Sequence, residues 1–98
     1  MTLNKAKNGK ELTISIAGRV DTVTSPELEK LIQSEIGDIE SLVLDLKEMD
    51  YISSAGLRVL LAAHKTMSKK NGMKVKNAGA DVMEIFEVTG FSDILDIV

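Results

Sequence analysis

Apolar and polar residues alternate near the start of the chain in a way that predicts a β-hairpin. Leu12–Ile16 (sequence LTISI) alternates with a period of two, which is typical of a half-buried strand. Asn8-Gly9 precedes it and is the strongest short-range signal for a hairpin turn. Residues 2–17 are therefore predicted to form two antiparallel strands. We expect Gly18 to end the second strand and Arg19–Thr24 to form a loop.

A helical pattern follows this hairpin. Pro26 is typical of the first turn of a helix, where its missing N–H removes no hydrogen bond. We expect either Ser25 as the cap or a capping box of Thr24 with Glu27. Gly37 is expected to stop the helix. The apolar positions with helical spacing, which should form the buried stripe, are Leu28, Leu31, Ile32 and Ile36.

The central stretch of the chain predicts a strand, a loop and a second helix. Leu42–Leu46 is a short apolar run that contains only one carboxylate, Asp45, and is typical of a strand buried on both faces. Lys47–Ile52 is expected to be a loop. From Leu57 onward the apolar residues recur with the period of a helix, which should end near Asn71.

The last third of the chain predicts a strand, a third helix and a tail. Met73–Lys76 alternates like a half-exposed strand. Asp81 should open a helix that Gly90 closes. Ser92–Val98 is an amphipathic tail, interpreted as either a helical turn or an edge strand. The residues of the third helix that should face inward are Val82, Ile85 and Phe86.

The order β-β-α-β-α-β-α predicts a single α/β domain over residues 1–98, with a mixed sheet of about four strands covered by helices. The chain has 98 residues, 44% of them hydrophobic and 28% charged, which is typical of an ordinary soluble globular domain. No apolar run approaches the roughly 20 residues that span a bilayer. We therefore expect no membrane contact. We also expect a monomer.

Charge and cysteine content exclude several kinds of partner and of chemical site. The net charge of −3 argues against nucleic acid as the main partner. The chain contains no cysteine, which excludes disulfides and thiol nucleophiles and fits a reducing compartment. The first residues lack the apolar core of a signal peptide. A cytoplasmic location is expected.

Two serines lie where the predicted central strand gives way to the second helix. A serine in this position can cap the helix by accepting a hydrogen bond from one of its first N–H groups. The small residues that follow Ser53 and Ser54, such as Ala55 and Gly56, would let another molecule approach the backbone closely. This serine turn is the candidate functional site.

The predicted topology brings further polar residues toward this turn. Right-handed crossovers would place the loops after the second and third strands side by side at one edge of the sheet. Asp21 and Thr22 should then lie near the two serines, and Asp45 is a further candidate neighbour. For Asp45 the alternative is a structural strand-end carboxylate, and for Asp21 a solvated loop or cap residue.

Catalysis by this chain is not expected. The only histidine, His64, lies ten residues beyond Ser54, or about 15 Å along a helix, too far to act as the base of that serine. Asp21 and Asp45 could form an acid–base pair, but no metal-ligand cluster or phosphate-binding loop accompanies them. We therefore predict no enzyme activity, no metal site and no cofactor.

The strand with Asp45, the following Tyr51-Ile52 and the turn Ser53–Leu57 (sequence SSAGL) resemble the STAS domain, and more narrowly the bacterial anti-sigma-factor antagonists. The family's turn usually reads Asp-Ser-(Ser/Thr/Ala)-Gly-Leu, so the alignment places Ser54 on the phosphorylated serine and Ser53 on the usual Asp. A second family signature, Gly-x-aliphatic-Asp, matches Gly18–Asp21. The resemblance extends over most of the chain, from about Glu11 to Phe91.

The resemblance implies the STAS fold and partner switching. The unphosphorylated protein would bind an anti-sigma factor that is also a serine kinase, and phosphorylation of Ser54 would release it. ATP would belong to that partner, and a phosphatase is a further candidate partner. The alternative is a STAS ligand-binding or scaffold module, as in lipid-transport or stress complexes, without a phosphorylation switch. The residues implied to surround the phosphosite and bind the partner are Asp21, Thr22, Asp45, Ser53, Ala55, Gly56 and Leu57.

Overall fold

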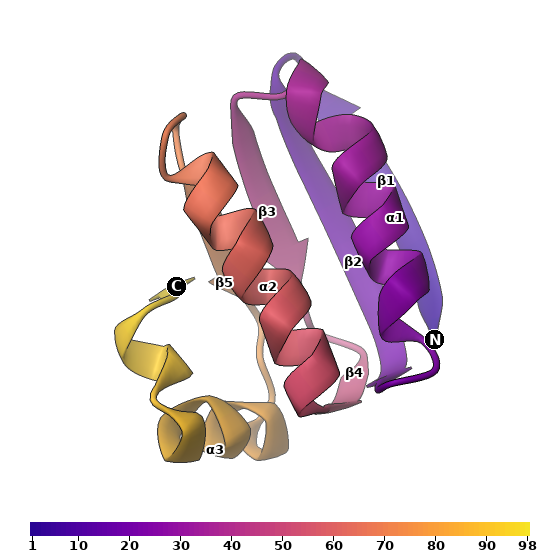
Figure 1. Cartoon of the computed structure of the whole chain (residues 1–98), viewed down its shortest axis with the longest axis vertical. Helices are drawn as coiled ribbons and strands as arrows, with labels where there is room; N and C mark the ends of the chain where they lie inside the picture. The colour runs from indigo at the N-terminus through magenta and orange to yellow at the C-terminus, as the bar shows by residue number, and fades with distance from the viewer.

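The chain folds into a mixed six-stranded sheet with three α-helices, as described for residues 1–98 by the computed structural model (Figure 1). The predicted α/β class with a mixed sheet covered by helices is confirmed, although the sheet has six strands where about four were expected. The elements in chain order are β1 (Thr2–Asn8), β2 (Glu11–Val20), α1 (Ser25–Glu35), the 3-10 helix η1 (Ile36–Asp38), β3 (Ser41–Asp45), β4 (Met49–Ile52), α2 (Ser54–Met67), β5 (Met73–Lys76), α3 (Ala80–Thr89), the 3-10 helix η2 (Phe91–Asp93) and β6 (Asp96–Ile97).

Strand β2 lies between β1 on one side and two successive strands on the other. It pairs antiparallel with β1, as the predicted hairpin requires. Its first half pairs in parallel with β3, and its last residues, Gly18–Val20, pair in parallel with β4. The path through the sheet is β1-β2-β3-β5-β6, with β4 beside the end of β2. Gly18 therefore does not end the strand as expected; it has a φ of +86° and marks a shift in register.

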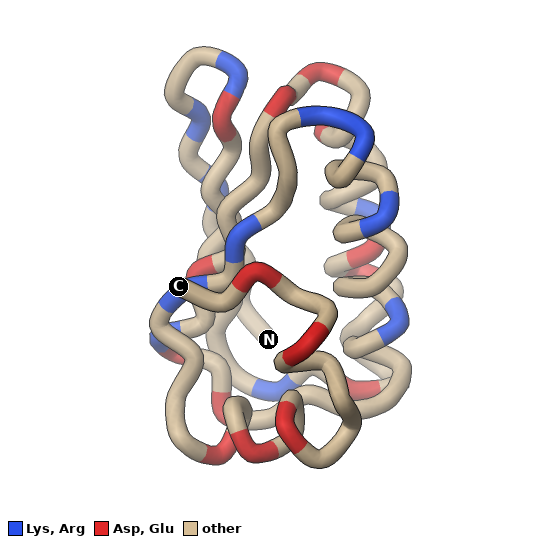
Figure 2. The backbone as a smooth tube through the Cα atoms, turned by 90° about the vertical axis from the view of Figure 1, so that its left-hand side faces the viewer, with Lys and Arg blue, Asp and Glu red and all other residues tan.

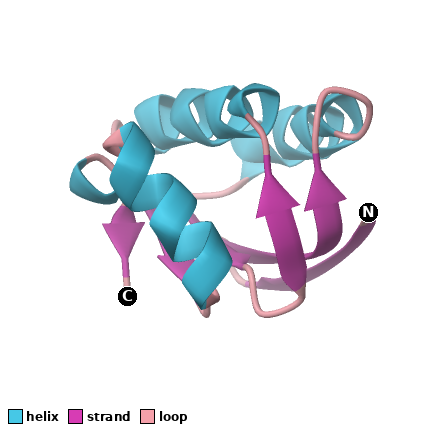
Figure 3. Ribbon diagram, turned by 90° about the horizontal axis from the view of Figure 1, so that it is seen from below, coloured by secondary structure: helices cyan, strands magenta, loops and turns pink.

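Helices α1 and α2 lie side by side over one face of the sheet, and α3 crosses its lower end (Figures 1 and 3). The apolar residues of β2 that face these helices are buried. The alternate residues Thr13, Ser15 and Ala17, which point to the other face of the sheet, are only half-buried. Val43 in β3 is likewise half-buried. The expectation of a strand buried on both faces is wrong, because the helices cover one face.

The helix ends mostly follow the predicted signals. Helix α1 has Pro26 in its first turn, but Thr24 makes no side-chain cap bond, so the predicted capping box is not formed. Helix α2 ends at Met67, a turn earlier than expected, and the N–H of Gly72 then donates to the carbonyl of Met67 at 3.0 Å. Gly90 closes α3 in a left-handed conformation with φ +82°, as predicted.

One strand, β4, was missed from the sequence, and another, β6, was expected only as one of two alternatives. The expected loop Lys47–Ile52 contains β4, a four-residue strand in which apolar and polar residues do not alternate. The tail contains both of its alternatives, because the helical turn η2 precedes the edge strand β6. β4 is the more important of the two, since it leads directly into the serine turn.

Charge is distributed unevenly over the molecule. All 12 lysines and arginines lie at or before Lys76, so the α3 end of the chain carries acidic side chains without basic ones. Figure 2 shows this as red segments without blue along α3 at the bottom of the view. None of the helices combines the length and apolar character that crossing a membrane would require.

Candidate functional site

Strands β2 and β4 end at the same level and hold two loops together. Val20 and Ile52 are partners in the parallel register. The N–H of Ser53 donates to the carbonyl of Val20 at 2.8 Å. The loop that starts at Asp21 therefore lies directly beside the serine turn, and the predicted proximity is confirmed.

The two serines have different positions at the start of α2. Ser53 is the N-cap residue, and its half-buried side-chain oxygen accepts a hydrogen bond from the N–H of Gly56 at 3.4 Å. Ser54 is the first residue of the helix and is exposed. Its hydroxyl takes part in none of the side-chain hydrogen bonds of the structure. The capping role thus belongs to Ser53, and the hydroxyl of Ser54 is accessible for modification.

Gly56 allows α2 to pack closely on the ends of β2 and β4. A Cβ atom at this position would lie 2.7 Å from Cγ1 of Ile52 and 2.8 Å from Cγ1 of Val20, two fully buried side chains. The expectation that Gly56 lets another molecule approach is wrong, because its open side faces the core. Leu57 is also buried, at 4% exposure. Of the small turn residues, Ala55 remains partly at the surface beside Ser54.

Asp21 organises the loop between β2 and α1. Its Oδ1 atom accepts hydrogen bonds from the N–H groups of Val23 and Thr24, each at 3.0 Å. In return, the N–H of Asp21 donates to the hydroxyl oxygen of Thr24 at 2.9 Å. The N–H of Thr24 is the main reason that the pKa of the Asp21 carboxyl lies below its ordinary value. Asp21 is therefore ionised at neutral pH and fixes the shape of this loop.

This loop presents an apolar side chain to solvent. Val23 is 85% exposed, and its backbone is held by the Asp21 carboxylate. Thr22 beside it is exposed as well. The sequence analysis predicted Thr22 but missed Val23, because one valine in a polar loop gives no periodic signal.

Arg19 and Tyr51 lie next to each other at the ends of β2 and β4. They are register partners, and the guanidinium carbon of Arg19 lies 4.4 Å from the centre of the Tyr51 ring. The Nε atom of Arg19 is also 3.9 Å from Oδ2 of Asp21. The sequence analysis missed this contact because it requires β4, which was taken for a loop. Arg19 therefore contacts both the Tyr51 ring and the Asp21 carboxylate.

Asp45 does not belong to the serine turn. It is paired with Ser15, five residues before Val20 on β2, which corresponds to about 16 Å along a strand. Burial raises the pKa of the Asp45 carboxyl, but hydrogen bonds from the Asn77 side chain and the Lys47 N–H, both at 3.1 Å, bring it below its ordinary value. The predicted placement beside the serines is wrong, because β4 carries the chain along β2 before α2 begins.

The site offers an acceptor hydroxyl without catalytic groups around it. His64 lies on α2, where its Nδ1 atom is buried without a hydrogen-bond partner. Nowhere does the structure gather three or more histidine, aspartate or glutamate side chains that could hold a metal ion. The site therefore consists of an exposed Ser54 hydroxyl at the start of α2, with the ionised Asp21 carboxylate in the adjoining loop.

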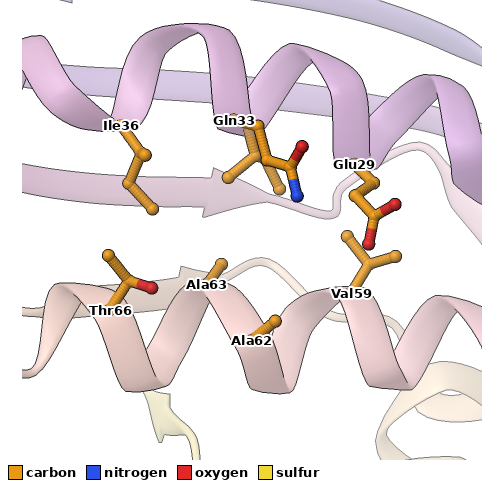
Figure 4. Close-up of a pocket in the computed structure, with 8 residues that line it drawn as sticks. Glu29, Gln33, Ile36, Val59, Ala62, Ala63 and Thr66 are labelled. Carbon is orange, nitrogen blue, oxygen red and sulfur yellow. The ribbon is translucent and has the colours of Figure 1, made fainter.

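The hollows of the surface are small. A groove between α1 and α2 has a volume of about 90 Å³, and the widest hollow, between β4 and α3, has about 280 Å³. Pockets for small molecules usually measure roughly 300–1,000 Å³. Figure 4 shows side chains of the two helices pointing toward one another across the first groove. Its lining residues are Glu29, Ile32, Gln33, Ile36, Val59, Ala62, Ala63 and Thr66.

Comparison with known proteins identifies the family. The family model of the STAS domain matches residues 2–98. The anti-sigma-B factor antagonist of Bacillus subtilis is 34% identical over 94 residues, covering 93% of this chain and 84% of that protein. The putative anti-sigma factor antagonist BtrV of Bordetella bronchiseptica is 34% identical over 99 residues, covering 99% and 85%. A crystal structure of an anti-sigma factor antagonist from Mycobacterium paratuberculosis matches with a TM-score of 0.89 and 27% identity, covering 98% of this chain and 83% of that one.

These comparisons confirm the resemblance found in the two sequence motifs. The relatives are named as antagonists, which are regulatory binding proteins, and this agrees with the prediction that the chain is not an enzyme. The fold described above is thus that of a known regulatory domain. The chain belongs to the STAS domain family and, within it, to the bacterial anti-sigma-factor antagonists.

Proposed function

We propose that this protein binds an anti-sigma factor that is also a serine kinase, and that phosphorylation of Ser54 releases it. In the unphosphorylated state the complex sequesters the anti-sigma factor and leaves its sigma factor free for transcription. A phosphatase that removes the phosphate would complete the cycle. We also propose that the protein is cytoplasmic and monomeric.

The observation that carries this proposal is the structural difference between the two serines. Ser53 caps α2 through its side chain, whereas Ser54 is exposed with a free hydroxyl at the first helical position. A kinase can therefore reach Ser54 without breaking a hydrogen bond of the fold. The relatives named as anti-sigma factor antagonists support the identity of the partner.

The chemistry requires the partner to supply the catalyst. The Oγ atom of Ser54 would attack the γ-phosphorus of ATP held by the kinase, ADP would leave, and the hydroxyl proton would pass to a base of the kinase. This chain contributes only the acceptor, since its single histidine lies ten residues further along α2. The anti-sigma factor therefore determines the rate of its own release.

The phosphate would change the surface far more than the fold. Phosphoserine carries a charge of about −1.5 to −2 at neutral pH. It would stand beside the ionised Asp21, next to the exposed side chains of Thr22 and Val23. Burying such a group in an interface without a partner charge is costly, and about 2.8 kcal/mol already corresponds to a hundredfold loss of affinity.

The experiment combines phosphorylation with binding. The purified protein is incubated with ATP and a kinase-type anti-sigma factor from the same organism, and the product is mapped by mass spectrometry. We expect one phosphate on Ser54, none in Ser54→Ala, and normal phosphorylation in Ser53→Ala. Ser54→Ala should bind the anti-sigma factor constitutively, and Ser54→Asp should bind it more weakly.

Two results would contradict the proposal. Phosphate on Ser53 instead of Ser54 would show that the alignment of the turn is wrong. Binding without phosphate on either serine would favour the alternative of a scaffold module without a switch. The small hollows of the surface give no support to the ligand-binding form of that alternative.

A further inference from the structure

We propose that Arg58 is the internal counter-ion of a phosphate on Ser54. This inference rests on the proposed function, because it requires that Ser54 carries the phosphate. Ser54 and Arg58 are both exposed residues of α2, four positions apart. Side chains at positions i and i+4 of a helix are neighbours, with Cβ atoms about 5–6 Å apart. A phosphate on Ser54 is therefore within reach of the Arg58 guanidinium.

The order of the two groups is the favourable one. An anion at position i with a cation at position i+4 gives a stronger helical ion pair than the reverse order. The planar guanidinium also matches the geometry of phosphate oxygens and can donate two parallel hydrogen bonds. Ser53 has no such neighbour, because the residue four positions after it is the buried Leu57. The spacing thus selects Ser54.

Arg58 is available for this contact in the unmodified protein. It takes part in none of the ion pairs or cation–π contacts of the structure. The only other arginine of the chain, Arg19, lies over the Tyr51 ring and beside Asp21. Phosphorylation would then change two groups at once, since it adds an anion at Ser54 and occupies the free cation at Arg58.

The surroundings of the serine turn make this cation more important. Asp21 is ionised beside the turn, and the α3 end of the chain has no basic residue. Arg58 provides the positive charge on the same helix face as Ser54. The charged groups on the neighbouring ends of β2, β4, α1 and α3 are Arg19, Asp21, Asp50, Glu27 and Asp81.

The test measures the phosphate directly. Phosphoserine is incorporated genetically at position 54 in the otherwise unchanged chain and in its Arg58→Gln variant, and both are titrated by phosphorus NMR. The second pKa of free phosphoserine is about 6. We expect this pKa to lie about 0.3 lower in the chain that keeps Arg58 than in the Arg58→Gln variant, as helical ion pairs of this type predict. The difference should disappear at about 1 M salt.

Matched variants exclude a general charge effect. Lys65→Gln removes one positive charge from an exposed position further along α2 and should leave the titration unchanged. Arg58→Lys should keep part of the difference, because lysine retains the charge without the planar fork. As a second measurement, Ser54→Glu should stabilise the chain against urea more with Arg58 than with Arg58→Gln.

Equal titrations of the Arg58 and Arg58→Gln chains would overturn the inference, as would Ser54→Glu and Arg58→Gln effects that simply add. The experiment uses no kinase. A failure of the anti-sigma factor to phosphorylate Ser54 would therefore contradict the proposed function alone, and the two outcomes remain distinguishable.

Discussion

Asp21 and Asp45 end two neighbouring strands of the sheet and have similar chemistry, yet only Asp21 lies beside the serine turn. Each carboxylate accepts hydrogen bonds from nearby N–H groups, and each has a pKa below its ordinary value. They differ in what lies beside them. β4 runs along the end of β2 and places Ser53 next to Asp21, whereas Asp45 is paired with Ser15 further back on that strand. The comparison shows that strand register, and not the position of an aspartate at a strand end, decides which carboxylate joins a site.

The largest expected effect concerns the packing of Gly56, at the start of α2, against the ends of β2 and β4. Gly56→Ala should lower the free energy of unfolding by about 1–3 kcal/mol, because the new methyl group collides with the buried side chains of Val20 and Ile52. Urea unfolding measures this loss. Gly37→Ala is the control, since a Cβ at Gly37 meets no atom within 4 Å, and its stability should change little. Equal stability of the two variants would mean that α2 can shift away from the strands without cost.

The second prediction compares the two aspartates themselves. Asp21→Asn should change the affinity for the anti-sigma factor about fivefold, because it removes the charge beside Ser54 but keeps the oxygen that accepts from Val23 and Thr24. Asp45→Asn removes the same charge about 16 Å away along β2 and should leave this affinity unchanged. Titration calorimetry with the unphosphorylated protein measures both. If both variants change the affinity equally, the effect comes from net charge and not from position.

The third prediction tests whether the Asp21 loop presents an apolar contact. Val23→Thr should reduce affinity for the anti-sigma factor roughly fivefold, because it replaces a methyl group of similar shape by a hydroxyl. Val88→Thr on α3 is the matched control, since Val88 is 80% exposed and Val23 85%. The same binding assay serves for both. A loss in Val88→Thr alone would place the partner on α3 instead.

The smallest expected effect is the response of the Asp21 carboxylate to a falling pH. A lowered pKa in the folded state means that the stabilisation is present at neutral pH and is lost as the pH falls through that lowered value. The amide signals of Val23 and Thr24 should therefore shift with a midpoint below the ordinary Asp value of 3.8. NMR titration measures the midpoint, and Asp21→Asn should abolish the shift. A midpoint at or above 3.8 would show that these N–H groups do not hold the carboxylate in solution.

The sequence was sufficient for much of the fold and for the position of the two serines at the start of α2. The period of the residues after Leu57 predicted α2, and the Asn8-Gly9 turn predicted the hairpin. These signals are local, because they depend on residues a few positions apart. The turn itself was recognised from its motif, which places Ser54 at the start of the helix.

The parts that sequence reasoning missed depend on contacts between distant residues. β4 has four residues, and its strand character comes from pairing with the end of β2. A prediction that lacks β4 cannot include the contact of Arg19 with Tyr51. It also places Asp45 wrongly beside the serines. Gly56 looked like an opening for a ligand, whereas its space is filled by residues of the core.

The central position of β2 has a consequence for how local motions spread through the protein. β2 is paired with β1 over Glu11–Ala17 and with β3 and then β4 along its other side. Strands paired on both sides open only when the domain unfolds as a whole, so their amide hydrogens should exchange with solvent most slowly. The Asp21 loop and, through Val20, the serine turn are attached to the end of this strand. Phosphorylation of Ser54 would then act on a partner through the added charge. The slow exchange of the β2 amide hydrogens should stay unaltered.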